Sequence, residues 1–229
     1  MISPLCLTKN PEANFRYLPV IKDLSQRSGG SDLILEVGGG DFNLTNFCKR
    51  PITVLDTSFN PKVESSLVTA VISVGQKFPF PDASFDFVVS LDTLEHISKA
   101  DRPLFLKELQ RVSKKYVYIG FPEGSGAVRQ DQELNSISSE KFLREHIKNG
   151  LPNLSQVTSQ FANSGWRLVW QKSNVNLRFR GYLMRLWLLS SRNLLFKVVF
   201  KMLGLFSPLY KLFSIGECYR QILFFEKSF

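Results

Sequence analysis

A run of three glycines, Gly38 to Gly40, follows a short apolar segment that contains Glu36. A glycine-rich turn lets the backbone approach a ligand closely, and a helix after it offers free N–H groups to an anion. Asp56 stands 20 residues after Glu36, at the end of a second apolar segment. An acid at this spacing can accept hydrogen bonds from both hydroxyls of a ribose. These features favour a nucleotide site over the alternatives, a plain tight turn and a capping aspartate.

Asp92, Glu95 and His96 form a second group of polar residues, and positions three apart on a helix share a face. The group is a candidate site for a divalent cation. The alternative is that Glu95 and His96 cap and order their loop, which requires no further ligand. We favour this alternative and expect no metal. His146, the second of two histidines, is a candidate general base for a substrate hydroxyl, and a structural role near a helix end is the alternative.

Residues 78–97 read FPFPDASFDFVVSLDTLEHI. This stretch closely resembles the signature of the type 11 class I S-adenosylmethionine-dependent methyltransferases. Residues 36–40 are then similar to the glycine motif of that family, Asp56 to its ribose acid, and residues 105–112 to the helix before its fifth strand. The resemblance covers residues 30–122 well and the late strands more loosely. Some small-molecule and RNA methyltransferases also resemble the Asp92 to His96 group, in their case around a divalent cation.

The resemblance implies an enzyme whose cofactor is S-adenosyl-L-methionine. The cofactor-binding residues that it implies are Glu36, Gly38, Gly40, Asp56, Gly75, Gln76 and Asp92. Gly38 and Gly40 would flank the methionine moiety, Asp56 would hold the ribose, and the loop at Gly75 and Gln76 would edge the adenine. Asp92 and the turn to His96 would lie near the methionine and the substrate.

A related group of bacterial methyltransferases has a segment similar to the one that begins at His146 and continues to GLP. His96 and His146 are therefore the candidate catalytic residues, although alignment of the nucleophile is the main requirement for methyl transfer. The sequence departs from the family at two positions. Phe42 stands at the third glycine, and Val74 replaces an acid that often faces the adenine amine.

Apolar segments that alternate with helical patterns predict the elements that hold these residues. We expect strands over 33–37, 52–56, 69–74, 85–91, 116–121, 166–171 and 221–226, and helices over 11–27, 102–112, 139–149 and 154–164, with another helix that starts within 43–48. This order predicts a Rossmann-like α/β fold with a mostly parallel seven-stranded sheet. We expect one domain over 1–229, with an N-terminal helix in 1–30, a cofactor-binding core in 31–122 and a basic amphipathic helical insertion in 178–213 between the last two strands.

The positive charge of the chain is concentrated in one segment. The 229 residues carry a formal charge of +9, and residues 146–216 contain ten Lys and Arg but no Asp or Glu. Arg178, Arg185 and Arg192 recur every seven residues, and Lys197 and Lys201 are four apart, so helices would align them among bulky apolar residues. The segment is interpreted as a lid over the substrate, as a peripheral contact with an anionic membrane, or as both. Binding to nucleic acid is a weaker alternative, because the cations alternate with aliphatic side chains.

Composition favours a location in the cytoplasm, because the three cysteines are scattered and no signal peptide or charge-free apolar span is visible. The function predicted from these features is methyl transfer to a small-molecule or lipid-linked acceptor, with oxygen as the favoured acceptor atom. An RNA or DNA methyltransferase and a catalytically silent cofactor-binding module are the alternatives. The identity of the acceptor, the oligomeric state and the need for a general base stay open.

Overall fold

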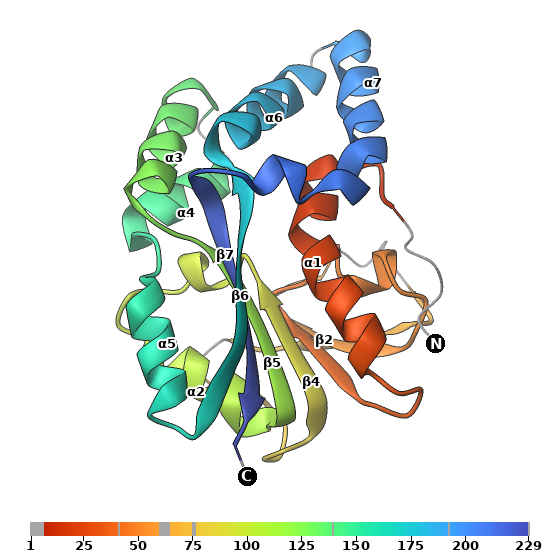
Figure 1. The fold of residues 1–229 in the computed structure, drawn as a ribbon, viewed down its shortest axis with the longest axis vertical. Coiled ribbons are helices and arrows are strands. Elements are labelled where there is room, and N and C mark those ends of the chain that lie inside the picture. Colours follow the sequence, from red (N-terminus) through yellow and green to blue (C-terminus); the bar gives the residue numbers. More distant parts are fainter. Residues whose placement is uncertain are drawn as a thin grey trace.

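The structure is a computed structural model that describes residues 7–40, 42–59, 65–74, 77–138, 140–191 and 193–228. One seven-stranded sheet has the order β3-β2-β1-β4-β5-β7-β6 (Figure 1). The strands are β1 (Ile34–Val37), β2 (Ile52–Asp56), β3 (Val68–Ile72), β4 (Phe85–Leu91), β5 (Ser113–Pro122), β6 (Trp166–Asn176) and β7 (Cys218–Lys227). The first five strands pair in parallel, and β7 is antiparallel to β5 and β6. The predicted fold class is confirmed.

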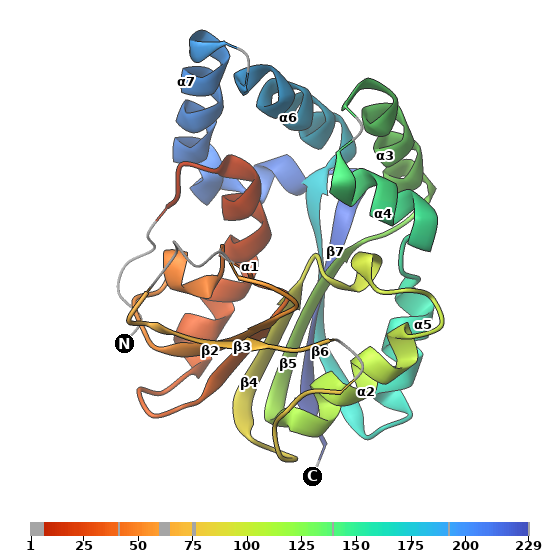
Figure 2. The same cartoon turned by 180° about the vertical axis from the view of Figure 1, so that it is seen from behind.

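Helices cover both faces of the sheet (Figures 1 and 2). The main helices are α1 (Pro11–Arg27), α2 (Arg102–Val112), α3 (Ser125–Ser138), α4 (Lys141–Asn149) and α5 (Leu154–Ala162). Leu35 and Val88 face a core layer that includes side chains of α2 and α5, whereas Ile34 and Val89 face a layer that includes α1. Neighbouring strand residues therefore point to opposite faces, as the pleat of a strand requires.

Two helical features differ from the sequence-based expectation. The helix expected to start within 43–48 is only the 3-10 turn η1 (Leu44–Asn46), so that prediction was wrong. Pro51 and the start of β2 at Ile52 follow closely, and a crossover helix needs more chain than this connection provides. The sequence also gave no indication of α3, whose residues are mostly polar and show little helical periodicity.

The helical insertion predicted between the last two strands is confirmed. It consists of α6 (Leu177–Ser190), α7 (Leu194–Leu203) and the 3-10 helices η3 (Gly204–Leu209) and η4 (Leu212–Ser214). In Figure 1, α6 and α7 lie at the top of the molecule, and the insertion packs onto the start of α1. Within the described residues, no helix is long and apolar enough to cross a membrane. The last member of the arginine stripe, Arg192, lies outside the described residues.

Candidate active site

The glycine turn after β1 and the end of β2 border a cavity of about 380 Å³, here called the strand-end cavity. Gly38 has a φ of +80°, and a Cβ added there would lie 2.1 Å from the side-chain oxygen of Thr93. Only glycine fits this position without displacing its neighbour. Gly40, with a φ of +51°, lies beside the carboxylate of Asp56. The turn therefore brings bare backbone to the rim of the cavity.

Asp56 is the polar side chain at the end of β2 that borders the strand-end cavity. Its Oδ1 accepts hydrogen bonds from the backbone N–H groups of Thr57, at 2.7 Å, and Ser58, at 3.4 Å. These bonds orient the carboxylate, and no hydrogen bond to Oδ2 is present in the described part of the chain. An oriented carboxylate with a free oxygen beside a glycine turn fits the ribose hydroxyls of S-adenosylmethionine. The residues present at this cavity therefore suit that cofactor.

Glu36 lies in the core beneath the glycine turn, with a side chain that is 1% exposed. It accepts hydrogen bonds from the hydroxyl of Tyr17, at 2.7 Å, and from the backbone N–H of Leu44, at 2.6 Å. The sequence predicted that free N–H groups after the glycine turn could bind an anion. The N–H of Leu44, at the start of η1, instead donates to the carboxylate of Glu36. Burial raises the pKa of Glu36 to about 7, although the two hydrogen bonds oppose this shift. Glu36 joins the glycine turn to α1, and it is not among the residues that line the cavity.

The adenine end of the site is described only in part. Gly75 and Gln76, which were predicted to edge the adenine, lie outside the described residues. Val74, which takes the place of the acid found there in the family, is 63% exposed just after β3. Ser73, beside it, borders the strand-end cavity.

Asp92 follows β4 with a φ of +52°, and its carboxylate is held by cations. Both of its oxygens accept hydrogen bonds from the guanidinium of Arg220, and Arg16 lies 3.5 Å away. Arg220, which is 1% exposed, also donates to Glu12 at 2.7 Å and to Asn174 at 3.0 Å. Burial disfavours the charge of Asp92, but Arg220 and Arg16 hold its pKa below the usual range. Asp92 therefore serves as a fixed ion-pair partner.

A second cavity, of about 250 Å³, lies between α1, α4, the insertion and the start of β7, and is here called the insertion-side cavity. Its lining residues are Asn10, Glu12, Arg16, Asp92, Glu95, His96, Phe142, His146, Arg180, Met184, Trp187, Phe200, Tyr219 and Arg220. Two of these residues, Asp92 and His96, also line the strand-end cavity. The two cavities therefore adjoin at the end of β4.

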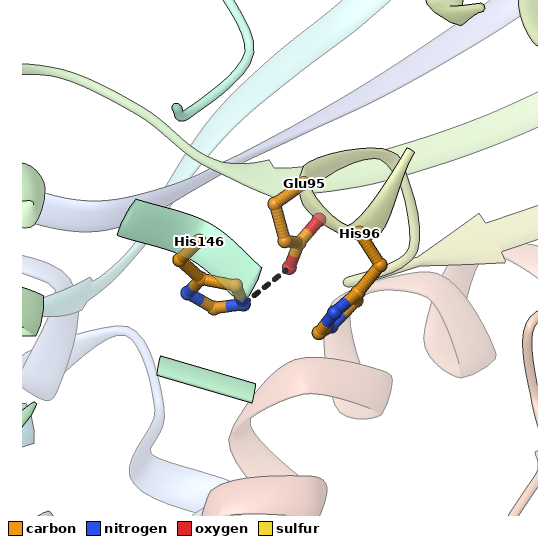
Figure 3. Close-up of side chains that lie close together, drawn as sticks. All are labelled: Glu95, His96 and His146. Carbon is orange, nitrogen blue, oxygen red and sulfur yellow. Dashed lines mark ion pairs between the residues drawn. The ribbon is translucent and has the colours of Figure 1, made fainter. Parts of the chain in front are cut away.

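Both predicted catalytic histidines border the insertion-side cavity, and each is oriented by a carboxylate. The Nδ1 of His96 lies 2.7 Å from Glu145, and the Nδ1 of His146 lies 2.8 Å from Asp131. Their ring centroids are 4.9 Å apart, and Glu95 lies beside both rings (Figure 3). Burial and the nearby His146 lower the pKa of His96, so its imidazole is favoured in the neutral form.

Several residues of this wall were not predicted from the sequence. Asp131, on α3, accepts hydrogen bonds from the Tyr219 hydroxyl, at 2.9 Å, and from Arg180, at 3.3 Å. Arg220 reaches the site from β7, 128 positions after Asp92 in the sequence. Each belongs to an element whose place beside the site depends on long-range packing. The one hint in the sequence is the charge of Arg220 beside the apolar residues of β7, because a charged side chain in a buried strand requires a partner.

Comparisons with known proteins agree with this geometry. Residues 35–119 match the family model described as "Methyltransferase domain". Among solved structures, magnesium protoporphyrin IX methyltransferase from Synechocystis PCC 6803 with bound SAH aligns over 96% of this chain and 86% of its own, with a TM-score of 0.60 and 10% identity. A SAM-dependent methyltransferase from Aquifex aeolicus aligns over 94% and 91%, with a TM-score of 0.52 and 17% identity. The search of curated proteins found no match.

The family match and the fold together confirm three predictions made from the sequence. The chain carries a class I methyltransferase domain, it is an enzyme of that class, and its cofactor is S-adenosylmethionine. The identities to the solved structures are low, so those structures support the fold and carry no information on the acceptor.

Proposed function

We propose that this chain, which carries a class I S-adenosylmethionine-dependent methyltransferase domain, methylates an oxygen atom of an acceptor bound in the insertion-side cavity. The observation that carries the proposal is the meeting of the two cavities at Asp92 and His96. A cofactor in one cavity and an acceptor in the other would then face each other across a single wall. Holding two reactants in line accounts for much of the acceleration of a bimolecular step.

In this proposal each wall of the site has a separate task. Gly38, Gly40 and Asp56 hold the cofactor, which supplies an electrophilic methyl group when it is bound. The Nε2 of His96, kept neutral and oriented by Glu145, accepts a hydrogen bond from the acceptor hydroxyl and takes its proton. The acceptor oxygen forms the new bond to the methyl carbon, and the sulfur keeps the electron pair of the bond that breaks.

The cofactor half of the proposal is tested by calorimetry with S-adenosylmethionine. Asp56→Ala removes charge-assisted hydrogen bonds to the ribose and is expected to weaken binding by about 1–3 kcal/mol. Glu133→Gln, on the exposed side of α3, serves as the matched control and should bind as the wild type does. Equal affinities of the Asp56→Ala and wild-type proteins would remove Asp56 from the site.

The acceptor half is tested with S-adenosylmethionine that carries a labelled methyl group, incubated with a cell extract that is then separated into lipid and aqueous fractions. His96→Asn should bind the cofactor normally but should label the product about 10²-fold more slowly, because it lacks a proton acceptor of suitable pKa. Unchanged labelling would exclude His96 from the reaction. Label on nitrogen or carbon of the product would exclude oxygen as the acceptor atom.

The insertion supports a lipid-linked acceptor. Its apolar residues Leu194, Leu195, Val198, Val199, Met202, Leu205, Phe206, Leu209, Leu212 and Ile215 are 42–76% exposed. Exposed lysines, Lys197, Lys201 and Lys211, flank them, and the segment contains no acid. Bulky apolar groups between cations suit the interface of an anionic lipid surface. Met184, Trp187 and Phe200 extend the apolar character into the insertion-side cavity.

This docking is tested by co-sedimentation with vesicles that contain anionic lipid. Binding should rise with the anionic fraction and fall with salt, and Lys197→Glu/Lys201→Glu should weaken it by roughly 1 kcal/mol for each cation near the surface. The control is Arg129→Glu, a charge reversal on the exposed side of α3 and outside the insertion. Absence of vesicle binding, with salt-dependent binding to RNA or DNA in its place, would favour the nucleic-acid alternative.

A further inference from the structure

We propose that Glu95, His96 and His146 form a binding site for a divalent first-row transition-metal ion. One ligand atom from each of the three side chains lies within 4.8 Å of the other two, and Figure 3 shows the three groups converging. From the sequence, Asp92, Glu95 and His96 were the candidate ligands and no metal was expected, so this proposal departs from that expectation. In the folded chain Asp92 is held by Arg220, and His146, 50 positions after His96, takes its place.

The distances suit a single ion. The Nε2 of His146 and the Oε1 of Glu95 are 3.9 Å apart, which is too far for a hydrogen bond. Two ligands of a tetrahedral ion with bonds of about 2.0–2.1 Å are about 3.4 Å apart. Binding therefore requires only small movements, and the side chain of His96, which is 31% exposed, has the space to make them.

Two polar atoms in this group, the Nε2 of His146 and the Oε2 of Glu95, are buried and have no hydrogen-bond partner among the residues that the structure describes. His146 is 5% exposed and Glu95 is 1% exposed. Buried polar atoms are almost always satisfied, because an unpaired one costs free energy. A cation bound by the Nε2 of His146 and the carboxylate of Glu95 would give this nitrogen a partner and would balance the buried carboxylate.

The surroundings of the two imidazoles match those of metal ligands. A metal-binding histidine usually gives its other ring N–H to a carboxylate, which fixes the ring and its tautomer. Asp131 takes this role for His146 and Glu145 for His96, both through Nδ1, so that Nε2 is the atom available to the ion. Asp131 is itself fixed by Tyr219 and Arg180.

The donor set selects the class of ion. Two imidazoles and one carboxylate suit Zn²⁺, Fe²⁺ or Co²⁺, whereas Mg²⁺ and Ca²⁺ prefer sites made of oxygen alone. Three protein ligands leave at least one position open, and all three residues line the insertion-side cavity. The open position would face an acceptor in that cavity.

The role of this ion in catalysis rests on the proposed function, whereas the metal site itself does not. An ion at Glu95, His96 and His146 would replace the hydrogen bond from the acceptor hydroxyl to His96. It would bind the acceptor oxygen and lower its pKa, so that the hydroxyl proton leaves to water before the new bond forms. This class of site would restrict the acceptor to molecules that carry a hydroxyl or another oxygen ligand.

The experiment loads the purified full-length chain with Zn²⁺ or Co²⁺, dialyses it against metal-free buffer and measures the retained metal by mass spectrometry. We expect about one ion per chain, and a visible absorption band from bound Co²⁺. His146→Asn and Glu95→Gln should abolish retention. The milder substitution Glu145→Gln, at a half-exposed positioning residue, should weaken metal affinity about 10–100-fold. Glu133→Gln should retain the ion as the wild type does.

Calorimetry with S-adenosylmethionine on the same samples separates this proposal from the proposed function. The His146→Asn protein should lose the ion and keep its affinity for the cofactor, which lies in the other cavity. Failure of the wild type to retain either ion, or equal retention by the His146→Asn and wild-type proteins, would overturn the metal site. Loss of cofactor binding by the wild type would instead overturn the proposed function.

Discussion

The carboxyl of Glu36 makes the stability of this fold depend on pH, and Glu36→Gln should remove that dependence. The pKa of Glu36 is about 7 in the folded chain, against a reference value of 4.5. Between these values the unfolded chain has released a proton that the folded chain still holds, so the free energy of unfolding falls as pH rises. The difference between the two pKa values corresponds to a decrease of about 3 kcal/mol in the free energy of unfolding, and this decrease is complete near pH 7. Below pH 4.5 both states are protonated and the penalty is absent.

The measurement is urea unfolding of wild type and Glu36→Gln from pH 4.5 to 8, followed by tryptophan fluorescence. The variant loses part of the hydrogen bonding to Tyr17 and Leu44, so it should be the less stable protein at low pH. The wild-type advantage should shrink by about 3 kcal/mol across the range and then stay constant. Glu133→Gln, at an exposed position, is the control, and its difference from wild type should stay flat. A difference for Glu36→Gln that does not change with pH would refute the reasoning.

Three further outcomes follow from the packing around the site. Gly38→Ala should destabilise the fold much more than Gly40→Ala in urea unfolding. The Cβ added at position 38 would lie 2.1 Å from the side-chain oxygen of Thr93, whereas the Cβ added at position 40 would make an ordinary contact at 3.5 Å. Arg220→Met should cost about 3–5 kcal/mol in the same assay by leaving Asp92 buried without its main partner, and a smaller loss would show that Arg16 suffices. Asn14→Ala removes the buried amide that donates to η3, so amide hydrogen exchange in η3 should accelerate; unchanged exchange would mean that other contacts hold it.

Much of the fold could be predicted because its signals are local. The apolar runs at 33–37 and 85–91 are buried parallel strands, whose residues face core on both sides of the sheet. The failure at residues 43–48 has a local cause as well. Asn43 caps the turn, but Pro51 and β2 end the connection before a helix can form. The polar helix α3 was missed because only a minority of its residues are buried, so it lacks an apolar stripe.

The residues of the candidate site also differ in whether a local sequence pattern predicts them. Gly38, Gly40 and Asp56 border the strand-end cavity or its rim, and their spacing could be read within 20 residues of sequence. Their assignment to the cofactor stays a prediction, as do those of Glu36 and Asp92. The partners of His146 could not be read in this way, because Asp131 belongs to a helix that the sequence pattern did not reveal.

The contacts of Arg220 show that the wall between the two cavities is built from elements that are distant in the sequence. Its guanidinium joins Glu12 on α1, Asp92 at the end of β4 and Asn174 on β6, three elements with no contact in sequence. Arg220 belongs to β7, so the wall is completed only when the chain returns from the insertion to the sheet. Side chains of α6 and α7 line the insertion-side cavity, whereas none of the insertion lines the strand-end cavity among the described residues. In the proposed function, the insertion would therefore shape the acceptor side and leave the glycine turn on the cofactor side unaltered.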